Sequence, residues 1–182
     1  MRRFIAVLGL LTLSGCGYNR IQSLDEQVNA YKSQIEVQLQ RRADLIPNLV
    51  ETVKGFATQE QEVFTAIADA RARLGGAIDQ GDVQEMARAN QGLTSALGRL
   101  LVISEAYPEL RSNQNFRDLQ VQLEGTENRI ATARSDYNTA VRAYNAYIRR
   151  FPQVLTAKAT GATPRPYFEA DESAAEVPKV NF

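Results

Sequence analysis

The sequence predicts an all-α protein, an antiparallel four-helix bundle with two long helices, two short helices and an extended C-terminal tail. Apolar residues recur at spacings of three or four through residues 24–151, which is typical of one face of a helix. No segment shows the sustained alternation of apolar and polar residues that a half-buried strand needs. Glycines and prolines divide the pattern into four segments with short connections, and segments joined in this way pack as antiparallel neighbours.

The first helix is expected over residues 24–56. Pro47 lies inside it, and because proline has no N–H and clashes with the carbonyl four residues earlier, we expect a kink near Ala43. Gly55 suits the end of the helix. Its buried stripe is expected to be Leu24, Val28, Tyr31, Ile35, Leu39, Arg42, Ile46, Leu49, Val53 and Phe56.

Two short helices follow. The second helix is expected to begin near Thr58, because Thr58 and Gln61 have the spacing of a capping box. Its end is weakened by Gly75-Gly76, and residues 80–82 form a turn. The third helix is expected over residues 83–105, and Pro108 marks a loop. The expected stripes are Val63 or Phe64 with Ile67, Ala70, Leu74 and Ile78, then Val83, Met86, Asn90, Leu93, Leu97, Leu100 and Leu101.

The fourth helix is expected over residues 113–150 and is stopped by Pro152. Residues 152–182 contain Pro164, Pro166 and Pro178 and show no helical periodicity, so this tail is expected to be extended and to pack on the bundle or on a partner. The bundle itself is assigned to residues 24–151. The expected stripe of the fourth helix is Phe116, Leu119, Leu123, Glu127, Ile130, Ala133, Tyr137, Val141, Tyr144, Ile148 and Phe151.

Residues 1–15 have the pattern of a bacterial lipoprotein signal peptide. A basic start is followed by the ten-residue apolar segment "FIAVLGLLTL" and then by small residues before Cys16. Ten apolar residues are too few to span a bilayer, which needs about 20. The Leu-Ser-Gly-Cys ending resembles a lipoprotein box, which implies cleavage before Cys16 and acylation of its thiol. Residues 16–23 are then a tether, and Gly17, in place of an aspartate, favours the outer membrane in a cell with two membranes.

Composition argues against several functional classes. The chain has no histidine and one cysteine, so His-based triads, disulfides within the chain and thiolate metal sites are not expected. It holds 21 basic and 21 acidic side chains without a basic cluster, so no nucleic-acid partner is predicted. No metal site and no cofactor is predicted.

The unequal helix lengths predict an overhang. At 1.5 Å per residue the long helices span roughly 50 and 57 Å and the short ones roughly 30 and 35 Å, so the start of the first helix and the end of the fourth extend beyond the hairpin. The sequence leaves three candidates to bury this surface: the chain's own tail, a second protein, or a second copy of the chain. Asn138 and Asn145 are expected to form hydrogen bonds with a neighbour such as the tail backbone. The candidate interface residues are Tyr31, Tyr137, Asn138, Tyr144 and Asn145.

A polar layer is predicted in the bundle core. Arg42 and Glu127 interrupt otherwise apolar stripes, and the antiparallel register of the two long helices places them within one turn of each other. We therefore expect a buried or half-buried ion pair, with Asn90 in the same layer. Such a pair can specify register, and the alternative interpretation is a polar pocket for a ligand.

Four stretches of the chain resemble the LemA family: "VQLQRRADLIPNLVETVKGF" (37–56), "ALGRLLVISEAYPEL" (96–110), "NFRDLQVQLEGTENRIATARSDYNTAVRAYN" (115–145) and "PYFEADESAAEVPKVNF" (166–182). The similarity extends from Tyr18-Asn19 to Phe182. It implies a four-helix bundle anchored at its N-terminus in a bacterial envelope, with no catalytic residues to transfer. It also implies, as candidate partners, envelope proteins of the TPM-domain type or membrane metallopeptidases. The chain departs from the family in having a lipoprotein-like start rather than a transmembrane helix, and Tyr31 where tryptophan is more common.

The leading hypothesis is a non-enzymatic envelope scaffold or adaptor, lipid-anchored through Cys16, that binds an envelope protein or a second copy of itself. The anchor would lie in the outer membrane facing the periplasm of a diderm cell, or on the outer face of the plasma membrane of a monoderm cell. The second hypothesis is a bundle that binds a small ligand through Arg42, Glu127 and Asn90. A carboxylate-based hydrolase ranks last, because no pair of acids stands out among 21.

Overall fold

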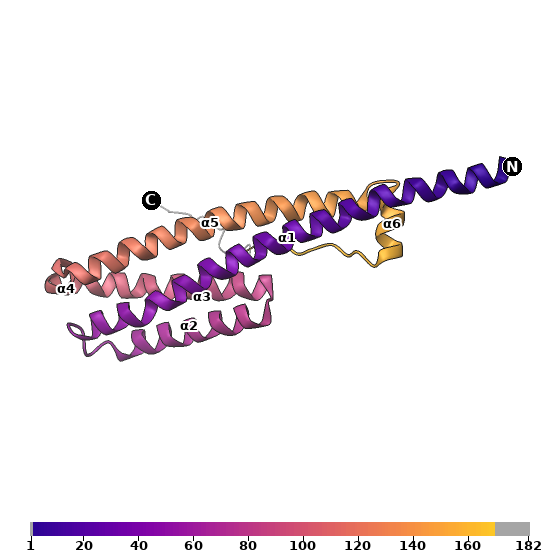
Figure 1. The fold of residues 1–182 in the computed structure, drawn as a ribbon. Helices are drawn as coiled ribbons and strands as arrows, with labels where there is room; N and C mark the ends of the chain where they lie inside the picture. The colour runs from indigo at the N-terminus through magenta and orange to yellow at the C-terminus, as the bar shows by residue number, and fades with distance from the viewer. Residues whose placement is uncertain (1, 170–182) are drawn as a thin grey trace, which may run out of the picture. The chain divides into compact units, whose positions relative to one another are not determined.

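The computed structural model of the chain describes residues 2–169, and it describes side chains from residue 17 onward. Every regular element in this range is a helix, which confirms the all-α class. The bounds, labelled in Figure 1, are α1 (Arg2–Lys54), α2 (Gln61–Gln80), α3 (Val83–Ala106), α4 (Pro108–Ser112), α5 (Gln114–Arg149) and α6 (Gln153–Thr160). The thiol of Cys16 and the tail residues 170–182 lie outside the described part.

The chain divides into two compact units, and both long helices contribute to each. Unit 1 consists of Met1–Gln34 and Ala133–Tyr167, and unit 2 of Ile35–Thr132 and Phe168–Phe182. Unit 2 therefore contains α2, α3 and α4 with parts of α1 and α5, whereas unit 1 contains α6 with the other parts of the two long helices.

The hairpin of α2 and α3 in unit 2 depends on its turn residues. Gly81 adopts a left-handed conformation with φ of 66°, which costs glycine little. Asp82 then caps α3, because its carboxylate accepts hydrogen bonds from the backbone N–H groups of Gln84 and Glu85. The two helices pack side by side, as seen in Figure 1.

One expectation about α2 is wrong. Helix α2 begins at Gln61 after Glu60, not with a Thr58 capping box, because the Gln61 side chain bonds the Thr58 carbonyl instead. The helix continues through Gly75-Gly76, where buried Leu74 and Ala77 flank the pair, and it ends at Gln80 before the expected turn. Tertiary packing of this kind outweighs weak intrinsic propensity.

Residues around Pro108, expected as a loop, form the short helix α4. Proline is favoured in the first turn of a helix, where its missing N–H leaves no bond unmade. Leu110 of this helix is fully buried. Leu101, placed on the buried stripe of α3, is instead exposed, since its neighbour Leu100 occupies the inward position.

Helix α1 is continuous through Pro47, and the structure shows how the backbone accommodates it. Proline removes the donor that would bond the carbonyl of Ala43. The Nε–H of Arg71 in α2 donates to that carbonyl oxygen at 2.9 Å. A side chain from a neighbouring helix thus replaces the missing backbone donor.

In unit 1, the first helix starts earlier than expected and the tail is not extended throughout. Residues 17–23, expected as a tether, belong to α1, and Ile21 is buried. Residues 153–160 form α6, which ends at Gly161 with φ of 71°. An eight-residue helix is too short to show periodicity, which is why the sequence pattern missed it. Phe151, expected on the buried stripe, lies after the end of α5 and is exposed.

Among the residues that the structure describes, none of the helices combines the length and the apolarity needed to cross a membrane.

Candidate functional site

The polar layer of unit 2 is built around Arg42 of α1. Its neighbours one turn away, Leu39 and Ile46, are buried on the same helix face, so the guanidinium is carried into the interior. The Arg42 side chain is only 5% exposed. A cation in such a position requires partners, because a buried unpaired charge is strongly unfavourable.

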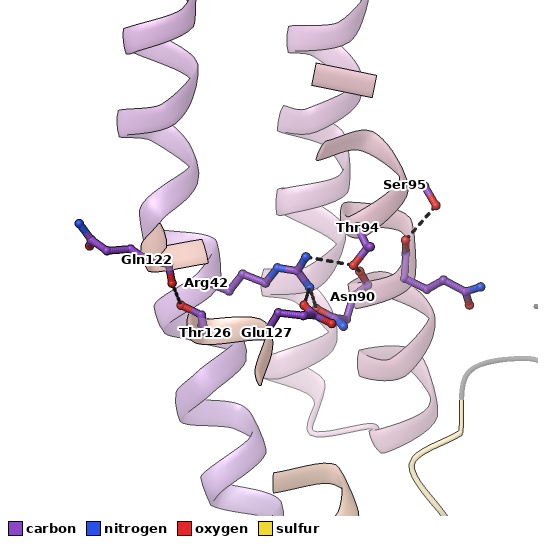
Figure 2. A network of polar contacts seen from close by, with 8 residues as sticks. Arg42, Asn90, Thr94, Ser95, Gln122, Thr126 and Glu127 are labelled. Atoms are coloured by element: carbon purple, nitrogen blue, oxygen red, sulfur yellow. Dashed lines mark hydrogen bonds and ion pairs between the residues drawn. The ribbon is translucent and has the colours of Figure 1, made fainter. Parts of the chain in front are cut away.

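Arg42 finds partners on two other helices, as Figure 2 shows. Its Nη1 donates to Oδ1 of Asn90 at 2.6 Å, and its Nη2 donates to the Thr94 hydroxyl at 3.0 Å. Nη1 also lies 2.6 Å from Oε2 of Glu127 in α5. The predicted contact between Arg42 and Glu127 is therefore present, and Asn90 joins it.

Sequence reasoning missed Thr94. It follows Asn90 by four residues, so both side chains lie on one face of α3. The Thr94 hydroxyl donates to the Asn90 carbonyl at 3.0 Å and accepts from Arg42, which holds it in position. The i, i+4 spacing from a predicted layer residue was the signal that could have identified it.

The electrostatics of the layer are asymmetric. Burial lowers the pKa of the Arg42 guanidinium, and the charge of Glu127 acts in the opposite direction. The Glu127 side chain is 42% exposed, so solvent stabilises the anion while the cation depends on protein atoms. Two buried atoms of the layer, Nε of Arg42 and Oε2 of Glu127, lack an aligned hydrogen bond. Since Oε2 is only 2.6 Å from Nη1, we treat this contact as an ion pair rather than a directional hydrogen bond.

A pocket of about 290 Å³ lies beside the layer. Five leucines of α1, α3 and α5 line it, and Arg42, Thr94 and Glu127 are among its polar lining residues. This volume is at the lower limit of ligand pockets, which run from about 300 to 1,000 Å³. Both terminal nitrogens of Arg42 already donate to protein atoms, so a ligand would have to compete with Asn90 and Thr94 for them.

The layer contains one carboxylate, Glu127, which is paired with Arg42. Arginine does not release its proton at neutral pH, and Asn90 and Thr94 do not titrate there, so Glu127 has no second acid–base group beside it in the layer. No cluster of three or more His, Cys, Asp or Glu side chains suited to a metal occurs among residues 17–169. The arrangement can orient helices and neutralise charge.

A second polar cluster lies in unit 1, where the chain returns along α1 and α5 after α6 (Figure 1). Asn145 bonds the backbone of Arg165 twice: its Nδ2 donates to the carbonyl at 2.9 Å, and its Oδ1 accepts from the N–H at 2.8 Å. The Tyr137 hydroxyl donates to the Pro166 carbonyl at 2.9 Å. The expected bond from an asparagine to the tail backbone is confirmed for Asn145.

The side chain of Arg165 completes this cluster, which we call the tail clasp (Asp25, Tyr137, Asn145, Arg165 and Pro166). Its Nε and Nη2 donate to the two carboxylate oxygens of Asp25, both at 2.9 Å. Bidentate pairs of this kind are the stronger class of charge-assisted hydrogen bond. The sequence analysis did not identify Asp25 or Arg165. No spacing signal could have found this pair, because 140 residues separate its members.

The candidate interface residues are distributed over unit 1. Tyr137, Tyr144 and Asn145 are buried, and Tyr31 and Asn138 are half-buried. Burial raises the pKa of Tyr137 to about 12, with the charge of Arg165 acting the other way. Burial, and then the Asp25 carboxylate, raise the pKa of Tyr144. The chain's own residues 165 and 166 occupy the hydrogen-bonding positions beside Tyr137 and Asn145.

These features define an all-α protein whose interior polar groups serve to bind its own helices and tail. The LemA family model matches residues 31–182, and the chain belongs to the LemA family. The match begins later than Tyr18-Asn19, where the resemblance was expected to start. The LemA family is not a known family of enzymes.

Curated relatives come from two magnetic bacteria. The chain is 31% identical over 175 residues to magnetosome proteins MamQ 1 and MamQ 2 of Paramagnetospirillum magneticum, covering 84% of this chain and 64% of each relative. It is 28% identical over 187 residues to magnetosome protein MamQ of Magnetospirillum gryphiswaldense, covering 90% of this chain and 69% of that relative. The chain thus spans just under two thirds of the length of the first two proteins.

Proposed function

We propose that this LemA-family protein is a lipid-tethered, non-enzymatic scaffold or adaptor of the bacterial cell envelope. The observation that carries the proposal is the ending Leu13-Ser14-Gly15-Cys16 after a basic start and ten apolar residues. Acylation of Cys16 would place the protein at the outer membrane, facing the periplasm, or on the outer face of the plasma membrane in a monoderm cell. More than one acyl chain would make the attachment stable.

The fold supports a scaffold role through its internal contacts. Within unit 2, Arg42 joins α1 to α3 and α5, and Arg71 joins α2 to α1. We propose that these four helices pack there as an antiparallel four-helix bundle, with the polar layer specifying their register. The small-ligand alternative has less support, because Arg42 and Asn90 are engaged with each other.

A partner would bind surfaces other than the tail clasp. The candidates remain an envelope protein of the TPM-domain type, a membrane metallopeptidase, or a second copy of this chain. Val102 and Val121 in unit 2 are exposed apolar side chains from which a partner can be sought.

The tether is tested by metabolic labelling with an alkyne fatty acid, followed by fractionation. The wild-type chain should carry the label and sediment with membranes, whereas Cys16→Ser should lose the label and leave the membrane fraction without unfolding. A Cys16→Ser chain that stays in the same membrane at the same level would contradict the tether.

The adaptor role is tested by photocrosslinking in intact cells. A photoreactive residue at Val121 should capture a second polypeptide, and the same residue at buried Tyr144 should capture only residues of its own chain. If the exposed position yields no adduct with another polypeptide, the adaptor proposal is wrong.

A further inference from the structure

Unit 1 exposes three large apolar side chains, two of them at the turn from α5 to α6. Phe151 is 81% exposed, Leu155 is 59% exposed and Tyr18 is 45% exposed. Phe151 and Leu155 lie on either side of Pro152, at the end of α5 and the start of α6. Exposed aromatic and aliphatic side chains that cluster in this way mark an interaction surface more often than isolated ones.

Tyr18 lies next to the point where α6 approaches α1, which is at Gly17. A Cβ added at Gly17 would lie 3.5 Å from the Thr156 hydroxyl and 4.0 Å from Cγ of Gln153. Gly17 is buried in this contact, and Tyr18 follows it directly. We call this surface, made of Tyr18, Phe151, Leu155 and the basic residues described next, the α6 corner.

The α6 corner is strongly basic although the whole chain has no net charge. Arg20, Arg149, Arg150 and Lys158 are all exposed. Residues 16–24 and 146–164, which form this region, contain no aspartate or glutamate. The four cations therefore have no acidic neighbour in sequence to neutralise them.

The rest of unit 1 shows that this charge is local. Arg165, which comes directly after the acid-free stretch 146–164, is paired with Asp25 through two hydrogen bonds. The positive charge is thus neutralised at the tail clasp and left open at the α6 corner.

We propose that the α6 corner binds the surface of an anionic phospholipid bilayer. Phe151, Leu155 and Tyr18 would enter the boundary between headgroups and acyl chains, while the four cations attract lipid phosphates. An uncompensated cluster of cations around a few apolar side chains complements such a surface. The proposal rests on the tether at Cys16, since that residue is joined to Gly17 and an acyl chain there would hold α6 at the membrane.

Tryptophan fluorescence can test the contact cleanly, because the chain contains no tryptophan. Phe151→Trp puts a single reporter at an exposed position, and the full chain is reconstituted in phosphatidylcholine vesicles with and without phosphatidylglycerol. Brominated lipid quenches only a tryptophan that reaches the acyl boundary. The matched control is Ser135→Trp, an exposed position on α5 about 21 Å along the helix from Arg149.

We expect the Phe151→Trp emission to shift to the blue and to be quenched several-fold more with phosphatidylglycerol than without it. The Ser135→Trp emission should not change. Replacing Arg149, Arg150 and Lys158 by glutamine in the Phe151→Trp chain should remove the dependence on anionic lipid, with circular dichroism confirming the fold. Quenching that is equal in both lipids, or equal at both positions, would overturn the proposal.

The same measurements separate a failure of the tether proposal from a failure of the proposal for the α6 corner. A Phe151→Trp chain whose mass shows acylation and which stays with the vesicles, but whose emission is not quenched, keeps the tether and overturns the corner. A Phe151→Trp chain without acyl mass that still shows lipid-dependent quenching overturns the tether and supports the corner.

Discussion

The polar layer of unit 2 and the tail clasp of unit 1 use the same chemistry in two different ways. Each pairs an arginine with a carboxylate and adds side-chain amide hydrogen bonds. In the layer the arginine is buried and all partners come from helices, whereas in the clasp the arginine is 40% exposed and lies on a segment without regular structure. The polar layer is therefore expected to stabilise unit 2. The tail clasp is expected to hold residues 165 and 166 against α1 and α5.

The largest effect is expected from Arg42→Met. This change leaves the buried Asn90 amide and Glu127 without their cation, and removing one partner of such a network costs about 3 kcal/mol. Urea unfolding followed by circular dichroism measures it. Arg42→Met combined with Asn90→Leu and Glu127→Leu should recover most of the loss. An Arg42→Met midpoint equal to wild type would show that the layer does not stabilise unit 2.

The clasp predicts a loss of stability at high pH. The pKa of Tyr137 is raised to about 12 in the folded chain, above the ordinary value of 10.0. Its contribution is therefore complete below pH 10 and is lost as pH rises through about 12, by roughly 2–3 kcal/mol in total. Urea midpoints of wild type should fall over this window. Tyr137→Phe should be less stable at pH 7 and show a shallower fall, and parallel curves for the two chains would contradict the assignment.

Asn145→Leu isolates the backbone clasp. It removes both hydrogen bonds to Arg165 and leaves the Arg165 N–H without its acceptor, at a cost of about 1–2 kcal/mol. Hydrogen exchange by NMR should accelerate at the Arg165 amide. Amides of the α2–α3 hairpin serve as the internal control and should keep their rates. Equal acceleration in the hairpin would mean that the clasp and the layer are one cooperative structure.

The smallest effect is expected where Arg71 bonds the carbonyl left open by Pro47. Arg71→Met should cost about 1 kcal/mol in the wild-type background. In a Pro47→Ala chain, residue 47 regains its N–H and can bond Ala43, so Arg71→Met should cost much less. A double-mutant cycle by urea unfolding gives the coupling, and additive effects would show that Arg71 does not replace the missing donor.

Sequence predictions succeeded for contacts that follow from helix periodicity and from the alignment of helices. The contact between Arg42 and Glu127 was predictable. When the two long helices run antiparallel and their midpoints are aligned, residues 42 and 127 fall within one helical turn of each other. The interruption of apolar stripes by charges marked the layer. Thr94 was missed although it lies four residues after Asn90, and it could have been found from that spacing. A hydrogen bond from an asparagine to the tail backbone was expected, but Arg165, the tail residue that forms it with Asn145, was not identified.

The errors occur where helix periodicity stops applying. Phe151 was placed on a buried stripe, but α5 ends at Arg149 and the following turn points the ring into solvent. Residues 153–160 were expected to be extended because three prolines lie further along, yet the segment itself contains none and forms α6. The α6 corner could not be derived from the pattern for the same reason.

The sequence by itself determined the helical class, the faces that are buried, the register of the long helices and the cysteine suited to a lipid tether. These depend on the local period of about 3.6 residues and on short motifs. Tertiary structure alone decided that Arg71 bonds the Ala43 carbonyl, that Arg165 pairs with Asp25, and that Gly17 lies against Thr156 of α6. Those contacts join residues far apart in the chain, and a hydrogen bond forms only where the fold brings donor and acceptor to about 3 Å.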